Sequence, residues 1–229
     1  MKIMIDAGHG YETPGKRTVD GMREYEFNRA VANEMKKLLH RYSGVTTLFS
    51  HSDKQDVPLY KRTKKANQAN VDLFVSIHAN AHGNGKEWTS ASGIETYVHS
   101  SKPKTAFALA KIVQAELIKE TKRKDRGVKT ASFHVLKETK MTAILCECGF
   151  MTNKVEAQLL KEQAYRHACA TGIVNAIVTF YKLVEGKGAQ HTDTQKLYKV
   201  QVGAFSEKEN AEKLVNELKG KGYQAFISN

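Results

Sequence analysis

The stretch Leu73-Phe74-Val75-Ser76-Ile77-His78 is a short apolar run that ends in a histidine. Continuous apolar runs of this length are typical of strands buried on both faces, as in a parallel sheet that helices cover. The pattern recurs at Ile3–Asp6 and at Ala143–Glu147, and helical periods separate these runs. The sequence therefore predicts an α/β fold with a mostly parallel sheet and helices on both of its faces.

The other elements follow from the same alternation of periods. A helix with buried positions Phe27, Val31 and Met35 is expected from Glu24 to about residue 41. The remaining helices are expected at 59–69, 106–120, 155–161 and 165–181, and the remaining strands at 45–49 and 94–98. The strand ending at His78 is expected to begin at Asp72, and residues 133–136 are expected to be extended.

A change in composition after Leu183 indicates a boundary. The stretch that follows is polar and contains glycines, which is typical of a linker. We expect a first domain at 1–183, a linker at 184–195 and a small strand-helix-strand unit at 196–229, with Ala211, Leu214 and Leu218 on its helix.

The composition limits the classes of function. Residues 1–183 hold 29 basic and 18 acidic residues, so the first domain carries most of the net charge of +12. A basic surface attracts any polyanion, but the basic residues lack the interleaved aromatics that stack on bases, so we expect no nucleic-acid partner. No run approaches the roughly 20 apolar residues that span a bilayer, and the start of the chain has no signal-peptide pattern, so we expect synthesis in the cytoplasm and no membrane insertion. The three cysteines (Cys146, Cys148, Cys169) are expected to be buried thiols.

Three polar residues follow the predicted strands. His9 stands between two glycines after the first strand, and His78 and Glu147 end two others. Functional groups gather beyond the carboxyl ends of parallel strands, so these side chains could converge on one site, although each could also simply terminate its strand. Catalytic zinc takes about three protein ligands and keeps one position open. From spacing, Glu24 at the start of the first helix is a candidate third ligand, as are Glu12 and Glu26.

Several motifs resemble the zinc-dependent N-acetylmuramoyl-L-alanine amidases of bacterial autolysins and phage endolysins. Asp6-Ala7-Gly8-His9-Gly10 is similar to the family's first histidine motif, and Ser76-Ile77-His78-Ala79-Asn80 to its second. Gly21-Met22-Arg23-Glu24 matches the segment of the metal glutamate, and Glu147-Cys148-Gly149-Phe150-Met151-Thr152-Asn153 matches that of the catalytic glutamate. His51 and Thr142 depart from the family pattern, which has arginine and proline at these positions, but neither change removes a ligand.

The resemblance implies a function and a set of site residues. One zinc ion would be held by His9, Glu24 and His78, and Glu147 would be the catalytic carboxylate. The substrate would be peptidoglycan, cut at the amide between N-acetylmuramic acid and L-alanine. Substrate contacts are expected from Arg62, Asn80 and Lys137. On the last strand, alternation sends Cys146 and Cys148 to the face opposite Glu147, so these thiols should not bind the metal.

The tail resembles part of the sporulation-related repeat, a peptidoglycan-binding module. The complete module has two strand-helix-strand units, whereas residues 196–229 supply one. Such a small piece buries little apolar surface and leaves a strand edge unpaired. We therefore predict that two chains pair their tails in a homodimer. The alternative is a tail that docks on its own first domain or stays loosely ordered.

Two other functions fit the same residues. A zinc peptidase that cuts the stem peptides would use the same chemistry, and a basic wall-binding protein without catalysis would explain the charge and the tail. The sequence does not decide between a phage endolysin, reaching the wall after holin-type release or lysis, and a host autolysin. It also leaves the preferred stem peptide open.

Overall fold

A computed structural model describes residues 1–13, 15–186, 202–221 and 227. The chain divides into two compact units, Met1–Ala189 and Gln190–Asn229. The first unit holds the sheet and all of the predicted site residues. Within the described residues, none of the helices combines the length and apolar character that a bilayer crossing requires.

The first unit is built on a six-stranded sheet in the order β2-β1-β3-β6-β4-β5. All neighbouring strands are parallel except β4 and β6, which are antiparallel. The strands are β1 Lys2–Ala7, β2 Thr46–Phe49, β3 Leu73–Asn80, β4 Ile94–His99, β5 Asp125–Ala131 and β6 Thr142–Phe150. The predicted α/β class, with a mostly parallel sheet, is confirmed.

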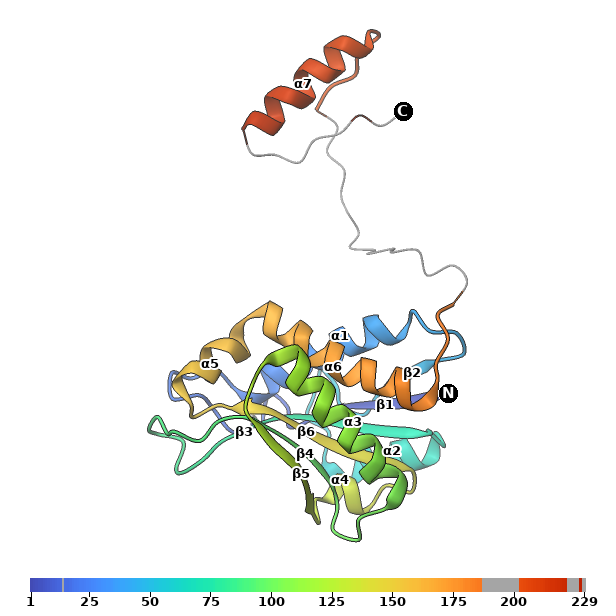
Figure 1. Ribbon diagram of the computed structural model, residues 1–229, viewed down its shortest axis with the longest axis vertical. Coiled ribbons are helices and arrows are strands. Elements are labelled where there is room, and N and C mark those ends of the chain that lie inside the picture. The colour runs from blue at the N-terminus through green and yellow to red at the C-terminus, as the bar shows by residue number, and fades with distance from the viewer. Residues whose placement is uncertain (14, 187–201, 222–226, 228–229) are drawn as a thin grey trace. The chain divides into compact units, whose positions relative to one another are not determined.

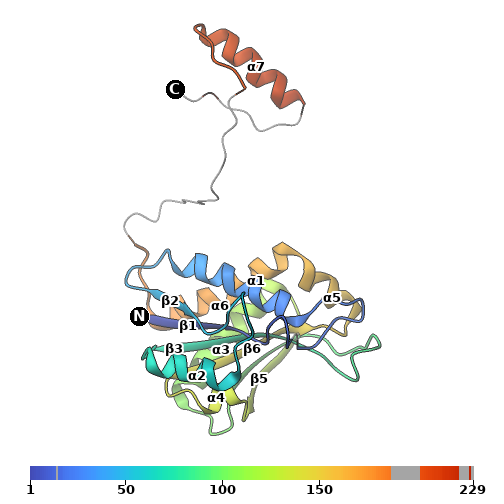
Figure 2. The ribbon, with the colours of Figure 1, turned by 180° about the vertical axis from the view of Figure 1, so that it is seen from behind.

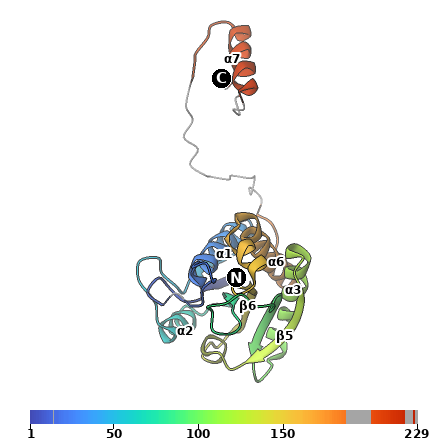
Figure 3. The same cartoon turned by 90° about the vertical axis from the view of Figure 1, so that its left-hand side faces the viewer.

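Helices cover both faces of this sheet. One face carries α1 Glu24–Leu39, α3 Lys104–Thr121 and α6 Gln163–Tyr181, and the other carries α2 Leu59–Gln68 and α4 His134–Lys137 (Figures 1 and 2). The short helix α5 Lys154–Lys161 follows β6. Viewed from the side, α1 and α2 lie on opposite sides of the sheet (Figure 3). Helices α3 and α6 approach closely at Gly172, where an added Cβ would lie 3.0 Å from the Cα of Leu117.

The two faces of the central strands have different compositions. On the face of α1, α3 and α6, β3 buries Leu73, Val75 and Ile77 in the larger core, next to Cys146 and Cys148 of β6. On the face of α2 and α4, the strands begin apolar, with Met4, Phe74 and Leu145 in the smaller core. Further along the strands, the side chains on this face are polar, because every second residue points to it. These residues are Asp6 of β1, Ser76 and His78 of β3, and Glu147 of β6. The sheet therefore delivers polar side chains to one end of one face.

The structure corrects one sequence prediction and adds a strand that was not predicted. Residues 133–136 were expected to be extended, but they belong to the start of the helical turn α4, whose Val135 and Leu136 pack in the smaller core. The strand β5 was not predicted, because Asp125–Ala131 has a charged, glycine-containing sequence without an apolar pattern. It is held as an edge strand by pairing with β4, and a bulge between Ile94 and Thr96 accommodates Gly127 at φ 79°.

In the second unit, the described part contains the helix α7 Lys208–Gly220. It includes the predicted helical positions Ala211, Leu214 and Leu218. Most of the predicted linker, residues 187–195, and most of the two predicted strands of the tail lie outside the described residues.

Candidate active site

His9 lies on the turn that follows β1. Its backbone has the left-handed φ of 66°, which is uncommon for a residue other than glycine. The turn is held by Arg62, whose guanidinium donates to the carbonyl oxygens of Ala7, at 2.5 Å, and of His9. Backbone strain of this kind persists where surrounding contacts enforce it, and functional residues are often held this way.

The glycines beside His9 are required by close packing. A Cβ on Gly8 would lie 2.1 Å from Cε1 of the His78 ring, and a Cβ on Gly10 would lie 2.0 Å from Oδ1 of Asp56. Neither distance is compatible with a side chain. Gly8 thus makes room for the second histidine, and Gly10 makes room for Asp56, which accepts hydrogen bonds from the backbone of Glu12 and Thr13.

Glu24 is the first residue of α1 and is 2% exposed. Its Oε2 accepts from the backbone N–H of Lys16 at 2.9 Å, and its own N–H donates to the carbonyl of Lys16, also at 2.9 Å. Asn28, one turn further along the helix, donates from Nδ2 to Oε1 of Glu24 at 3.3 Å and to the carbonyl of Gly8 at 3.1 Å. The carboxylate is therefore fixed from the loop and from the helix.

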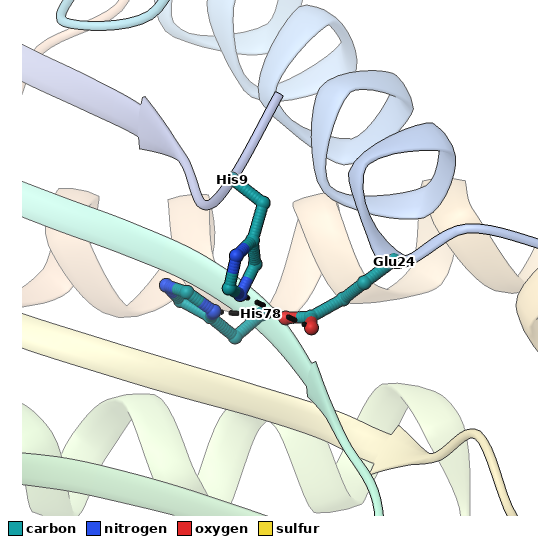
Figure 4. Close-up of side chains that lie close together, drawn as sticks. All are labelled: His9, Glu24 and His78. Carbon is teal, nitrogen blue, oxygen red and sulfur yellow. Dashed lines mark hydrogen bonds and ion pairs between the residues drawn. The ribbon is translucent and has the colours of Figure 1, made fainter. Parts of the chain in front are cut away.

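The side chains of His9, Glu24 and His78 point toward one another from a turn, a helix start and a strand (Figure 4). Nε2 of His9 lies 3.2 Å from Oε2 of Glu24, and Nδ1 of His78 lies 2.8 Å from Oε1. One donor atom from each of the three residues lies within 4.8 Å of the others. Two imidazole nitrogens and one carboxylate at this spacing form a candidate metal-binding group.

Electrostatics keep the Glu24 carboxylate ionised. Burial alone would raise its pKa, but hydrogen bonds and charge from His78 and His9 outweigh burial and lower the pKa well below its usual range. The group is thus available as an anionic ligand.

A chain of hydrogen bonds orients the ring of His78. Ser76 Oγ lies 2.6 Å from Oδ2 of Asp6, and Nε2 of His78 lies 3.1 Å from the same Oγ. Burial alone would raise the pKa of Asp6, but the charge of Arg62 and hydrogen bonds from Ser50, Ser76 and Arg62 lower it, so Asp6 is an acceptor. Ser76 must then give its single proton to Asp6 and accept one from Nε2 of His78. The Nδ1 atom, which faces Glu24, takes no part in this chain.

Glu147 lies on β6 directly opposite His78 in the parallel register. Paired residues on neighbouring strands project to the same face, so its carboxyl group lies next to the histidine cluster. Within the described residues its Oε2 is buried without a hydrogen-bond partner. Burial raises the pKa of Glu147 well above its usual range, and the charges of Glu24 and Glu95 raise it further. Perturbed carboxyl groups of this kind are candidates for proton transfer.

The predicted substrate residues lie in three different environments. Arg62 is 2% exposed, and its nitrogens donate to Asp6 and to backbone carbonyls, so the chain's own acceptors occupy it. Asn80 ends β3 and donates to Oε2 of Glu95 at 3.3 Å. Lys137 lies exposed on α4, where its Nζ is 3.3 Å from Oε1 of Glu138. Of these three residues, Asn80 is linked to Glu147, because it donates to Glu95 and Glu95 pairs with Glu147 across β4 and β6.

The competing carboxylates from the sequence lie elsewhere. Glu26 is exposed and accepts the N–H of Arg23 at the start of α1, and Glu12 is also exposed. Several supporting residues were not predicted, namely Asp6, Asn28, Ser76 and Glu95. A signal was present for Asp6 and Ser76, because each is a polar residue within an otherwise apolar strand.

Comparison with known proteins decides the family. A model of the N-acetylmuramoyl-L-alanine amidase family matches residues 3–179. The chain belongs to this amidase family. The predicted enzyme class is confirmed, in preference to a zinc peptidase or a wall-binding protein without catalysis. The amidase is a hydrolase of peptidoglycan that cuts the bond between N-acetylmuramic acid and L-alanine. A SPOR domain model matches residues 194–229.

Similar proteins agree with this assignment. The amidase is 35% identical to the N-acetylmuramoyl-L-alanine amidase CwlM of Bacillus licheniformis, over 99% of this chain and 84% of that protein. It is 34% identical to a sporulation-specific N-acetylmuramoyl-L-alanine amidase of Bacillus subtilis, with the same coverage. An N-acetylmuramoyl-L-alanine amidase structure from Clostridium difficile matches with a TM-score of 0.75 and 32% identity, over 79% of this chain and 96% of that one.

Proposed function

We propose that the amidase uses one zinc ion held by His9, Glu24 and His78, with Glu147 as the catalytic carboxylate. The observation that carries this proposal is the convergence of the three donor side chains within 4.8 Å of one another, beside Glu147. The metal and the role of Glu147 are the parts of the proposal that go beyond membership of the family.

The residues fit zinc in number and kind. Catalytic zinc sites use three protein ligands from histidine and carboxylate side chains and leave a position open, as this group does. Ligands at about 2.0–2.2 Å from an ion lie roughly 3–3.5 Å apart, close to the separations of 2.8 and 3.2 Å between the histidine nitrogens and the Glu24 oxygens. The hydrogen bond from His78 to Ser76 supplies the kind of support that metal-bound histidines have.

In the proposed mechanism Glu147 moves the proton. A bound zinc ion supplies Lewis acidity toward the scissile carbonyl and makes water a nucleophile near neutral pH. Glu147 takes a proton from the attacking water and returns it to the nitrogen of L-alanine as that nitrogen departs. The raised pKa of Glu147 supports both roles, because it makes the carboxylate a stronger base and lets the carboxyl group hold the proton until the nitrogen departs.

Metal content and product identity test the proposal together. The wild-type amidase should bind one zinc ion, and the variants His9→Ala, Glu24→Ala and His78→Ala should each lose it. His82→Ala is the matched control, because His82 is an exposed histidine outside the cluster. Glu147→Gln should retain zinc and lose wall hydrolysis. Full hydrolysis by Glu147→Gln would contradict the assigned role.

Mass spectrometry of digested wall tests the bond that is cut. The proposal predicts new amino termini on L-alanine and intact N-acetylmuramic acid. Cuts within the stem peptide would instead indicate a zinc peptidase.

We further propose that residues 1–183 form the catalytic domain and that residues 196–229, after a linker at 184–195, bind peptidoglycan. The SPOR match supports the second assignment. Pairing of two tails in a homodimer stays a prediction, because most of the residues that would pair lie outside the described part of the chain. Light scattering at micromolar concentration tests it: a dimer mass would support pairing, and a monomer mass would refute it.

A further inference from the structure

Two cationic side chains lie beside the active site without belonging to the metal cluster. Nε of Arg126 and Nζ of Lys129, both from β5, each lie 2.5 Å from Oε1 of Glu95. Glu95 is 1% exposed, whereas the side chains of Arg126 and Lys129 are 30% and 38% exposed. One buried carboxylate therefore holds two partly exposed cations.

The contacts around Glu95 make this arrangement rigid. Its second oxygen, Oε2, accepts from the hydroxyl of Tyr97 at 2.7 Å and from the amide of Asn80 at 3.3 Å. The guanidinium of Arg126 also lies over the ring of Phe150, 4.9 Å from its centroid. Both cations contact the same carboxylate, so the exposed part of each side chain is positioned to meet an anion from solvent.

The sheet places these cations in line with the reaction centre. Glu95 pairs with Glu147 across β4 and β6, and Glu147 pairs with His78 across β6 and β3. Paired residues share a face, so His78, Glu147 and Glu95 form a row across the sheet. Neighbouring strands lie about 4.8 Å apart, so the row places the Glu95 backbone roughly 10 Å from that of His78.

The row runs from His78 through Glu147 to Glu95, and its direction indicates which part of the substrate lies near Arg126 and Lys129. This step rests on the proposed function. Glu147 returns its proton to the nitrogen of L-alanine, so the departing peptide lies on the Glu147 side of the metal cluster. An extended peptide advances about 3.5 Å per residue and covers that distance in about three residues. The cations therefore face the stem peptide rather than the glycan.

We infer that Arg126 and Lys129 form a subsite for a carboxylate of the stem peptide, within about three residues of the scissile amide, and that Glu95 is the positioning residue that holds both cations. Arginine and lysine bind carboxylates through charge-assisted hydrogen bonds. The subsite makes the amidase sensitive to whether that carboxylate is free or amidated.

The test uses two pairs of soluble muramoyl peptides. Within each pair, one peptide carries a free carboxylate and the other a carboxamide at the same residue. That residue is the first after L-alanine in one pair and the second after L-alanine in the other. The zinc-loaded wild type should prefer the carboxylate form in one of the pairs by roughly tenfold to a hundredfold in kcat/KM, mainly through KM. Arg126→Gln with Lys129→Gln should abolish that preference by lowering kcat/KM for the carboxylate form to that of the carboxamide form, while zinc content is retained. Lys124→Gln is the control, because it removes one charge from an exposed residue near the start of β5 and should keep the preference.

Calorimetry with the released peptides provides a readout that needs no turnover. The wild type should bind the carboxylate peptide more tightly than its carboxamide, and the double variant should bind both equally. A double variant that keeps the wild-type preference in binding and kinetics would overturn the inference, as would an equal loss in Lys124→Gln. If the peptides bind with the expected preference but no substrate is cut, the proposed function fails and the subsite stands.

Discussion

Ser76 lies between His78 and Asp6, with its Oγ 3.1 Å from Nε2 of the histidine and 2.6 Å from Oδ2 of the aspartate. The residue therefore orients a proposed metal ligand without touching the metal. Its removal should leave the fold intact and weaken the metal site.

Ser76→Ala should lower zinc affinity by about 10- to 100-fold, because the loss of an outer hydrogen bond frees the histidine ring. Ser50→Ala is a matched control, since Ser50 also donates to Asp6 but does not contact His78 in the described structure. Competition with a chromogenic chelator measures both affinities. Equal affinities for the two variants would show that Ser76 does not position His78.

Gly8→Ala should remove the zinc site by steric conflict. The new Cβ would lie 2.1 Å from the His78 ring, so the ring or the turn must move. Overpacking of this kind costs about 1–3 kcal/mol in unfolding free energy. Gly220→Ala has no atom within 4 Å of its Cβ and should keep full zinc content. Metal analysis and thermal unfolding check both variants, and a zinc-loaded Gly8→Ala would contradict the packing argument.

Arg62→Met tests whether the guanidinium supports the fold or binds substrate. It would leave the buried Asp6 without its ion pair, which costs about 3–5 kcal/mol in unfolding free energy. We expect a large fall in Tm, and Arg62→Lys should also destabilise the protein, because lysine cannot reproduce the fork of donors. An unchanged Tm with a raised KM would instead support the substrate contact predicted from sequence.

His51 should make stability depend on pH. Burial lowers its pKa from 6.5 to about 4, so between these values the unfolded chain binds a proton that the folded chain does not. Stability from His51 is then fully present above pH 6.5 and falls by about 1–3 kcal/mol as the pH drops to about 4. His51→Asn, which can still accept from the N–H of Ala7, should flatten this part of the curve. Denaturant unfolding from pH 4 to 7 measures it, and identical slopes for both proteins would exclude the histidine as the cause.

The sequence predicted what depends on local pattern. Strands β1, β3 and β6 were recognisable from their apolar runs, and the residues at their ends, His9, His78 and Glu147, were expected to converge because parallel strands share an edge. Glu24 was favoured over Glu12 and Glu26 through the family resemblance, and its contacts with Lys16 and Asn28 give the physical basis for its position.

Other features depend on contacts distant in sequence. The strand β5 forms because β4 offers it a pairing edge, and α4 forms because Val135 and Leu136 fill a gap in the smaller core. The association of Glu95 with Arg126 and Lys129 follows from the pairing of β4 with β5, which apolar periodicity does not reveal. The need for glycine at position 8 arises from a ring 70 residues away.

X-ray diffraction from zinc-loaded crystals, recorded at the zinc absorption edge, tests the central claim most directly. We predict a single anomalous peak about 2.0–2.2 Å from Nε2 of His9, from a carboxylate oxygen of Glu24 and from Nδ1 of His78. A peak bound by other residues, or a catalytically active crystal without a peak between these three side chains, would contradict the account.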